Sequence, residues 1–255
     1  QRVPPSLLPL NQIFWMEWRD RLSKAKSLPL LDKEIIGCHK CPRLVQWREE
    51  VAVVKRKSYE DQTYWGKPIP GFGSDKPKLL IVGLAPGAHG ANRTGRIFTG
   101  DSSGDWLYGA LHKIGIAKIA TSTAIDDGQK LKDTRIICAV RCAPPGNKPL
   151  NEEREMCAPY FLRDLELSIA TTSAIIGLGS FAWDAIFKTL KEMGHPIKKV
   201  KFAHGASLKY SHEGRDYLLL ASYHPSQQNT FTGKLTRPML ESVLKKGGRF
   251  ASVVK

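Results

Sequence analysis

The chain has 255 residues, with 39 lysines and arginines against 24 aspartates and glutamates, which gives a formal net charge of +15. This length is within the range of one large α/β domain, and the charge indicates a polyanionic partner, nucleic acid first and a membrane surface second. No apolar run approaches the roughly 20 residues that span a bilayer. The first residues show no signal-peptide pattern, so we expect a cytoplasmic protein that does not enter a membrane.

The first part of the chain indicates an N-terminal extension. Residues 11–26, NQIFWMEWRDRLSKAK, place apolar side chains loosely at helical spacing and predict a helix with basic residues toward its end. A connection rich in proline and glycine follows at residues 66–77. We expect residues 1–77 to wrap around a core formed by residues 78–255, within a single domain that covers residues 1–255.

The core alternates two kinds of pattern. Short runs rich in isoleucine, valine and leucine predict strands buried on both faces, at residues 78–84, 135–140, 173–178 and 217–222. Helical patterns follow them, at residues 104–114, 152–167, 181–193 and 238–245. This order predicts an α/β fold with three layers, α/β/α, around a central, mainly parallel, four-stranded sheet. Residues 200–203 are a candidate for a further strand.

Ligands of open parallel sheets bind beyond the carboxyl ends of the strands. This rule selects three loops, at residues 85–101, 141–151 and 223–233. The first, in GLAPGAHGANRTGRIFTGD, fits neither a dinucleotide-binding nor a nucleotide-triphosphate glycine motif. Its polar side chains supply hydrogen-bond donors, and Phe98 offers a flat face, so the loop suits a planar heterocycle. The alternative is a structural turn with Phe98 in the core.

The third loop begins with His224, directly after a predicted strand, followed by a proline and Ser226. A histidine in this place is either catalytic or structural. Its position beside the other two loops favours the catalytic interpretation.

Five cysteines stand in a chain for which disulfides are not expected. Cys38 and Cys41 form a C-x2-C pair, whereas Cys142 and Cys157 are farther apart in the sequence. Four thiolates suit zinc or an iron–sulfur cluster, and the single C-x2-C pair favours the cluster. Such a group would staple the N-terminal segment to the core. Alternatively, Cys142 and Cys157 are ordinary core residues, the interpretation that we favour for Cys138 in RIICAV.

Four motifs together resemble those of the uracil-DNA glycosylase superfamily, and within it the fifth family, or type b. They are CHKCPRL, GLAPGAHGANRTGRIFTGD, AVRCAPPGNKP and SYHPSQQNTFTG, in this order. The resemblance implies a parallel sheet flanked by helices and an enzyme of base excision repair that flips a deaminated base out of DNA and hydrolyses its N-glycosidic bond. It also implies a four-iron four-sulfur (4Fe-4S) cluster bound by Cys38, Cys41, Cys142 and Cys157.

The resemblance also implies roles for single residues. Phe98 would stack on the flipped base, and His224 would donate a hydrogen bond to a base carbonyl oxygen. The base pocket would include Phe98, Ala85, Gly83 and Cys138. The residues expected to contact DNA are Ser226, Gln227, Gln228, Asn229 and Arg93.

Two departures from the superfamily pattern bear on mechanism and specificity. Many members have a polar residue in the first motif that positions the attacking water, but here Leu84 and Ala85 stand there, as is typical of type b. The residue that positions the water stays open, with Asn92, His89 and Asp101 as candidates in that order. We expect a dissociative reaction, in which a sugar cation forms early. Relatives often carry an asparagine where this chain has Cys138, which predicts a broad specificity that includes hypoxanthine.

Three functions are compatible with these motifs. The first is a monofunctional glycosylase, since no lysine stands in the pocket motifs as a nucleophile for a lyase step. The second is an iron–sulfur protein that flips and holds a damaged base without cleavage, and the third is a zinc-stapled nucleotide-binding protein. We expect a monomer that acts on DNA containing uracil or other deaminated bases.

Overall fold

The computed structural model describes residues 23–255. The helix expected at residues 11–26 lies outside this range, apart from residues 23–26, which are not helical. Within the described range, no helix is long and apolar enough to cross a membrane.

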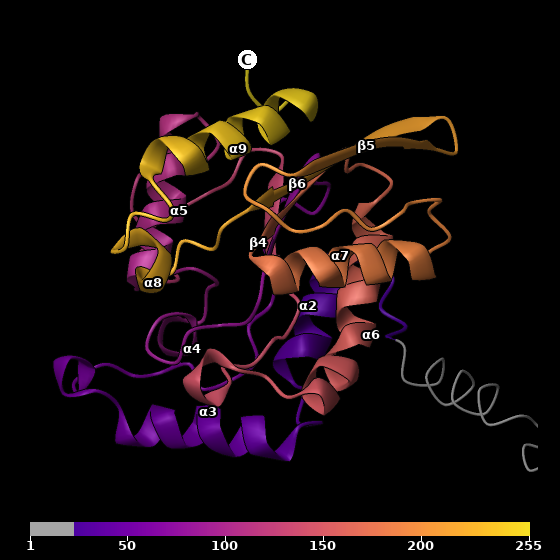
Figure 1. Cartoon of the computed structure of the whole chain (residues 1–255). Coiled ribbons are helices and arrows are strands. Elements are labelled where there is room, and N and C mark those ends of the chain that lie inside the picture. Colours follow the sequence, from indigo (N-terminus) through magenta and orange to yellow (C-terminus); the bar gives the residue numbers. More distant parts are fainter. Residues whose placement is uncertain (1–22) are drawn as a thin grey trace, which may run out of the picture.

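A six-stranded mixed sheet forms the centre of the molecule, in the order β1-β3-β2-β4-β6-β5 (Figure 1). Its inner strands are parallel and correspond to the four predicted ones: β2 (Leu79–Gly83), β3 (Thr134–Cys138), β4 (Ala174–Leu178) and β6 (Arg215–Ser222). The α/β class is therefore confirmed.

The predicted number of four strands was wrong. Each edge adds an antiparallel strand, β1 (Phe72–Gly73) and β5 (Ser207–His212), and residues 200–203 are not a strand. Both edge strands lack the apolar signal of a buried strand: β1 has two residues, and no residue of β5 is fully buried. Edge strands with polar, partly exposed side chains are hard to find from hydrophobic patterns.

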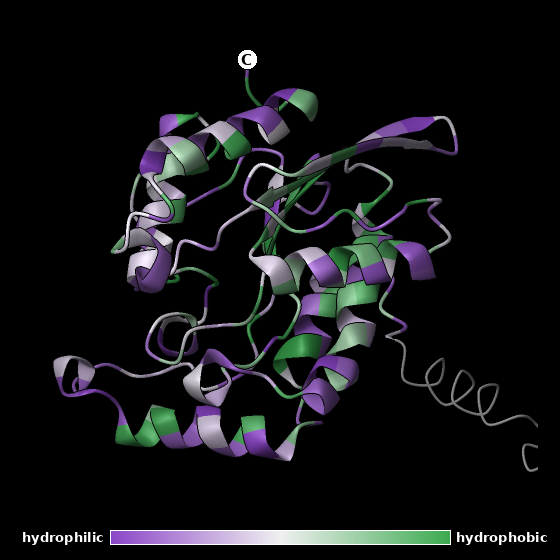
Figure 2. Ribbon diagram, viewed as in Figure 1, coloured by the Kyte–Doolittle hydropathy of each residue, from purple (hydrophilic) through white to green (hydrophobic). Residues whose placement is uncertain are grey.

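Two pairs of helices cover the two faces of the sheet (Figure 1). Helices α5 (Ser102–Lys113) and α9 (Arg237–Phe250) pack on one face, and α6 (Asn151–Ser168) and α7 (Ser180–Glu192) pack on the other. Alternate residues of β2 point to opposite faces, Ile81 toward α5 and Val82 toward α7. The central strands are mainly hydrophobic in Figure 2, whereas the far end of the β5–β6 hairpin is hydrophilic.

The extension contributes α2 (Leu28–Ile36), α3 (Pro42–Val54) and the short 3-10 helix η2 (Lys57–Tyr59). Leu31, Ile35 and Leu44 form a third apolar cluster with Tyr160 of α6. Three further short helices lie in the loops at the carboxyl ends of the strands: α4 (Ala91–Thr94), η3 (Pro145–Asn147) and α8 (Gln227–Thr230). The extension thus packs on the core close to these loops.

A buried chain of charges joins the extension to the sheet. Arg135 of β3 donates to both carboxylate oxygens of Asp32 in α2, at 2.7 and 2.9 Å, and to Oδ1 of Asp164 in α6, at 3.1 Å. Arg141, in the loop after β3, donates to Oδ2 of the same Asp164 at 2.5 Å. Arg135, Arg141 and Asp164 are almost fully buried. The paired groups replace part of the water that each charge would have at the surface, because each of the two guanidinium groups has at least one carboxylate partner.

Removing Asp164 leaves two buried guanidinium groups short of their shared partner. We expect Asp164→Ala to lower the free energy of unfolding by about 3–5 kcal/mol, as measured by urea denaturation. The matched control is Asp184→Ala, which breaks a surface pair with Lys199 at 2.9 Å, for which about 0–1 kcal/mol is expected. Equal losses in the two variants would contradict the assigned role of the buried chain.

Candidate active site and cysteine cavity

The loops after β2, β3 and β6 meet at the carboxyl ends of the parallel strands and line one cleft. Side chains from all three predicted loops contribute to it, including Phe98, Asn147 and His224. Of the other residues proposed for the site, Ala85, His89, Ser226, Gln227 and Gln228 also line it.

Phe98 lies on the end of the sheet. A Cβ atom on Gly83 would come 3.1 Å from the Phe98 ring and 3.2 Å from Cys138 Sγ. The absence of a side chain at Gly83 therefore leaves room for the ring. Phe98 has a left-handed backbone, with φ of 51°, which is rare for a bulky residue and typical of functional positions. Cys138 is 2% exposed and lies against Gly83. Neither Gly83 nor Cys138 lines the cleft.

His224 lies beside Phe98 in the cleft, with ring centroids 5.6 Å apart and an angle of 31° between the ring planes. Its backbone carbonyl accepts a hydrogen bond from Asn229 Nδ2 at 2.9 Å. The preceding residue, Tyr223, donates its backbone N–H to His204 Nδ1 at 3.2 Å. Burial lowers the pKa of His224 to about 4. The imidazole is therefore neutral near pH 7, with one N–H donor and one acceptor.

Two residues of the first motif face away from the cleft. The amide of Asn92 donates to the backbone carbonyl of Arg48 at 3.1 Å, and the side chain is buried. Arg93 donates to the carbonyls of His89 and Gly100, both at 2.8 Å, and its guanidinium lies 4.0 Å from the centre of the Tyr59 ring. Arg93 is therefore held by contacts within the protein, and its expected contact with DNA stays a prediction.

Sequence reasoning missed a wall of the cleft that the extension provides. Trp47 of α3, Arg56 and Tyr59 line it, and α3 runs beneath α4 in the view of Figure 1. Tyr64, also in the extension, contacts His89, with 3.1 Å between its hydroxyl oxygen and His89 Nδ1. The available signal for this wall was the combination of two aromatic residues with four basic ones in WREEVAVVKRKSY.

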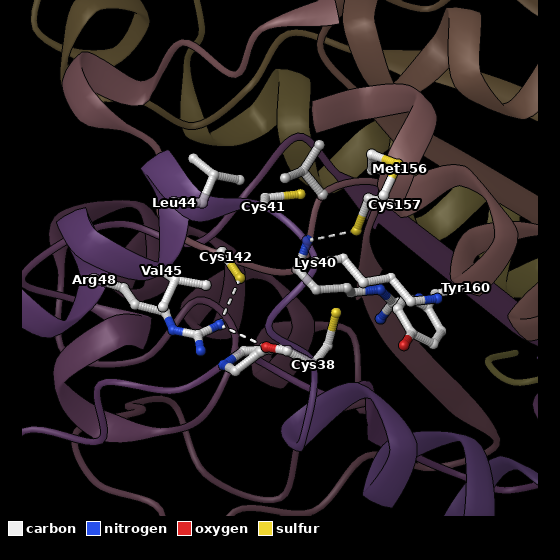
Figure 3. Close-up of a pocket in the computed structure, with 13 residues that line it drawn as sticks. Cys38, Lys40, Cys41, Leu44, Val45, Arg48, Cys142, Met156, Cys157 and Tyr160 are labelled. Carbon is white, nitrogen blue, oxygen red and sulfur yellow. Dashed lines mark hydrogen bonds between the residues drawn. The ribbon is translucent and has the colours of Figure 1, made fainter. Parts of the chain in front are cut away.

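Four of the five cysteines line a second, small cavity between α3, α6 and the loop after β3 (Figure 3). They are Cys38, Cys41, Cys142 and Cys157. Burial raises the pKa of Cys41 to about 11 and that of Cys157 to about 12, so both are thiols unless a cation binds them. Among residues 23–255, no three His, Cys, Asp or Glu side chains meet as ligands of a single metal ion would.

Hydrogen-bond donors surround these sulfur atoms. Arg48 Nη1 donates to Cys142 Sγ at 3.1 Å, and the backbone N–H of Arg141 donates to Cys157 Sγ at 3.3 Å (Figure 3). The side chains of Arg48 and Arg141 are almost fully buried, and both residues line the cavity. Nε of Arg48, and Nε and Nη1 of Arg141, have no hydrogen-bond partner in the described part of the chain. Two buried cations with spare donors suit a group of net negative charge.

Comparison with known proteins identifies the family of this chain. Residues 70–246 match the uracil DNA glycosylase superfamily. The chain is 48% identical to the type-5 uracil-DNA glycosylase of Mycobacterium leprae, over 90% of this chain and 98% of the relative. It is 44% identical to the type-5 enzyme of Thermus thermophilus, over 86% and 96%, and 28% identical to the type-4 enzyme of Archaeoglobus fulgidus, over 79% and 82%. The chain therefore belongs to the uracil DNA glycosylase superfamily, in its type-5 branch.

The environment of His224 predicts a ring that stays neutral in mildly acidic solution. Its folded pKa of about 4 lies below the value of about 6.5 for an unperturbed histidine. We expect the ring resonances of His224, followed by NMR, to be unchanged between pH 8 and pH 6. A titration midpoint at or above 6.5 would show that the ring is not desolvated.

Proposed function

We propose that this protein is a monofunctional DNA glycosylase, which removes uracil from DNA by hydrolysing the N-glycosidic bond and leaves an abasic site. The observation that carries the proposal is the pairing of Phe98 with a neutral His224 in one cleft at the carboxyl ends of the strands. The type-5 relatives are named uracil-DNA glycosylases, which supports this substrate.

Binding of DNA requires positive charge on the protein, and cleavage requires that the base leave the duplex. The net charge of +15 attracts the phosphate backbone. Two basic residues from different segments line the cleft: Arg56 comes from the extension, and Lys148 comes from the loop after β3. A base inside the duplex is out of reach, so it must be flipped out at a cost of a few kcal/mol, which backbone contacts and stacking offset.

Phe98 and His224 then act on different parts of the flipped base. The ring of Phe98 offers a stacking surface, worth about 1–3 kcal/mol per base. His224, neutral and fixed through its backbone by Asn229, donates its ring N–H to a carbonyl oxygen of the base. Negative charge grows on this oxygen as the bond to the sugar breaks, so the hydrogen bond is stronger in the transition state than in the bound substrate.

The substrate specificity depends on which groups of the base the residues of the cleft can bind. Burial raises the pKa of Cys138 to about 12, so the group is a neutral thiol, and it lies against Gly83, outside the lining of the cleft. An edge-reading amide is therefore missing at this position. His224 addresses a carbonyl oxygen, a feature that uracil shares with hypoxanthine. We propose that both bases are substrates.

We also propose that Cys38, Cys41, Cys142 and Cys157 hold a 4Fe-4S cluster. The four sulfur atoms share one cavity, and the unpaired N–H groups of Arg48 and Arg141 beside it are spare donors for the sulfur atoms of a cluster with four thiolates. When bound, the cluster links the extension to the loop after β3 and to α6. Its role is structural, because it fixes α3, which forms one wall of the cleft, to the core.

The cysteines offer a matched pair of variants for this cluster. We expect anaerobically purified protein to be brown and to contain about four irons per chain, and Cys142→Ala to lose both properties. Cys138→Ala, at a cysteine outside the cavity, should keep them. A colourless protein with stoichiometric zinc would contradict the cluster, as would full iron content in Cys142→Ala.

The glycosylase proposal is tested on end-labelled duplexes that contain one uracil or one hypoxanthine. We expect strand scission only after hot alkali, and a loss of about 100-fold or more in rate for His224→Ala, the scale of an oxyanion donor. His212→Ala, on the β5–β6 hairpin far from the cleft, is the control and should keep the wild-type rate. Binding without scission would leave the damage-binding protein as the function.

A further inference from the structure

The glycine loop after β2 folds around one carboxylate, that of Asp101. Its Oδ1 accepts the backbone N–H of Gly104 at 2.9 Å and caps helix α5. A Cβ atom on Gly90 would lie 1.9 Å from Oδ2, and one on Gly87 would lie 3.0 Å from it. Gly87 and Gly90 therefore leave the space that this oxygen needs. The cap uses Oδ1, and the loop backbone bends around Oδ2.

This carboxylate lies in the cleft of the proposed active site. Asp101 lines the cleft together with Phe98 and His224, and it is the only Asp or Glu among the described residues that do so. The first motif has Leu84 and Ala85 in the place of a polar residue. Asp101, at the end of the same motif, thus supplies a negative charge that is missing at Leu84 and Ala85.

Of the two other candidates for positioning water, Asn92 does not line the cleft, whereas His89 lines it but has one ring nitrogen engaged. The amide of Asn92 is buried against the carbonyl of Arg48 and does not line the cleft. Nδ1 of His89 contacts the hydroxyl of Tyr64. Burial, with the neighbouring Arg56 and Arg93, lowers the pKa of His89, which makes it a weak base.

We propose that Asp101 is a catalytic residue of the proposed glycosylase, where it orients the attacking water and accepts its proton. The bond from C1′ to the base nitrogen breaks first, and its electron pair leaves with the base, whose oxygen His224 binds. The water oxygen then forms the bond to C1′, and one water proton passes to Asp101 and on to solvent. The carboxylate also stabilises the positive charge that develops on the sugar. This inference rests on the proposed function.

The protonation state of Asp101 makes the role visible in a pH profile. Burial raises the pKa of its carboxyl group, and Asp105 on α5 acts in the same direction. The backbone N–H groups of Gly104 and Ser103, and Arg93 from α4, oppose this shift, while Cys138 faces it from β3 as a neutral thiol. The active form is the carboxylate, so the rate falls when the pH falls through the raised pKa.

Asp101→Asn is the decisive variant, because asparagine caps a helix as well as aspartate does but has no charge and cannot accept the proton. We expect a single-turnover rate on uracil duplexes at least 100-fold below wild type. The melting temperature and the affinity for an abasic duplex should stay at wild-type values. The acid limb of the wild-type pH profile should be missing in the variant.

Thr236→Ala controls for the loss of a helix cap, because Thr236 caps α9 by accepting the N–H of Met239 and does not line the cleft. It should keep the wild-type rate even if its melting temperature falls. An Asp101→Asn rate within twofold of wild type, or a loss that only follows a lower melting temperature, would overturn the role of Asp101. Wild-type protein that leaves uracil in place would instead overturn the proposed function itself.

Discussion

The carboxylate of Asp164, shared by two arginines, fixes the position of the N-terminal extension relative to the core. It accepts hydrogen bonds from Arg135 on β3 and from Arg141 on the following loop, and Arg135 reaches on to Asp32 in the extension. Buried charges of this kind tolerate little displacement, since an unpaired ion away from water is costly. The position of the loop after β3, which carries Cys142 and borders the cleft, follows from this constraint.

Arg48 connects the two sites that this loop separates. Its side chain donates to Cys142 Sγ in the cysteine cavity, while its backbone carbonyl accepts the amide of Asn92 beneath the cleft. The cysteine cavity and the cleft of the proposed active site are thus two sides of the same packed layer. A shift of α3 would be felt at both, because protein interiors transmit displacements through close packing.

The sequence predicted the parts whose signal is local. Continuous apolar runs revealed the four inner strands, and the rule on carboxyl ends of parallel strands brought Phe98 and His224 to one place. Side-chain direction was not predictable, because it depends on partners far away in the chain. Asn92 turns toward Arg48, and Arg93 closes its own loop, since buried donors take the nearest carbonyl acceptors. The wall from the extension was missed for the same reason.

The long reach of the extension has a consequence for the order of folding. Asp32 is 103 positions from Arg135, and Arg43 is 110 positions from its partner Glu153. During synthesis, α2 and α3 leave the ribosome long before these partners exist, and Leu31 and Ile35 stay without their apolar contacts in the meantime. Contacts between distant parts of a chain form late. Of the described helices, α2 and α3 can therefore dock only after residues 135–164 have been made, and the four cysteines come together only after Cys157.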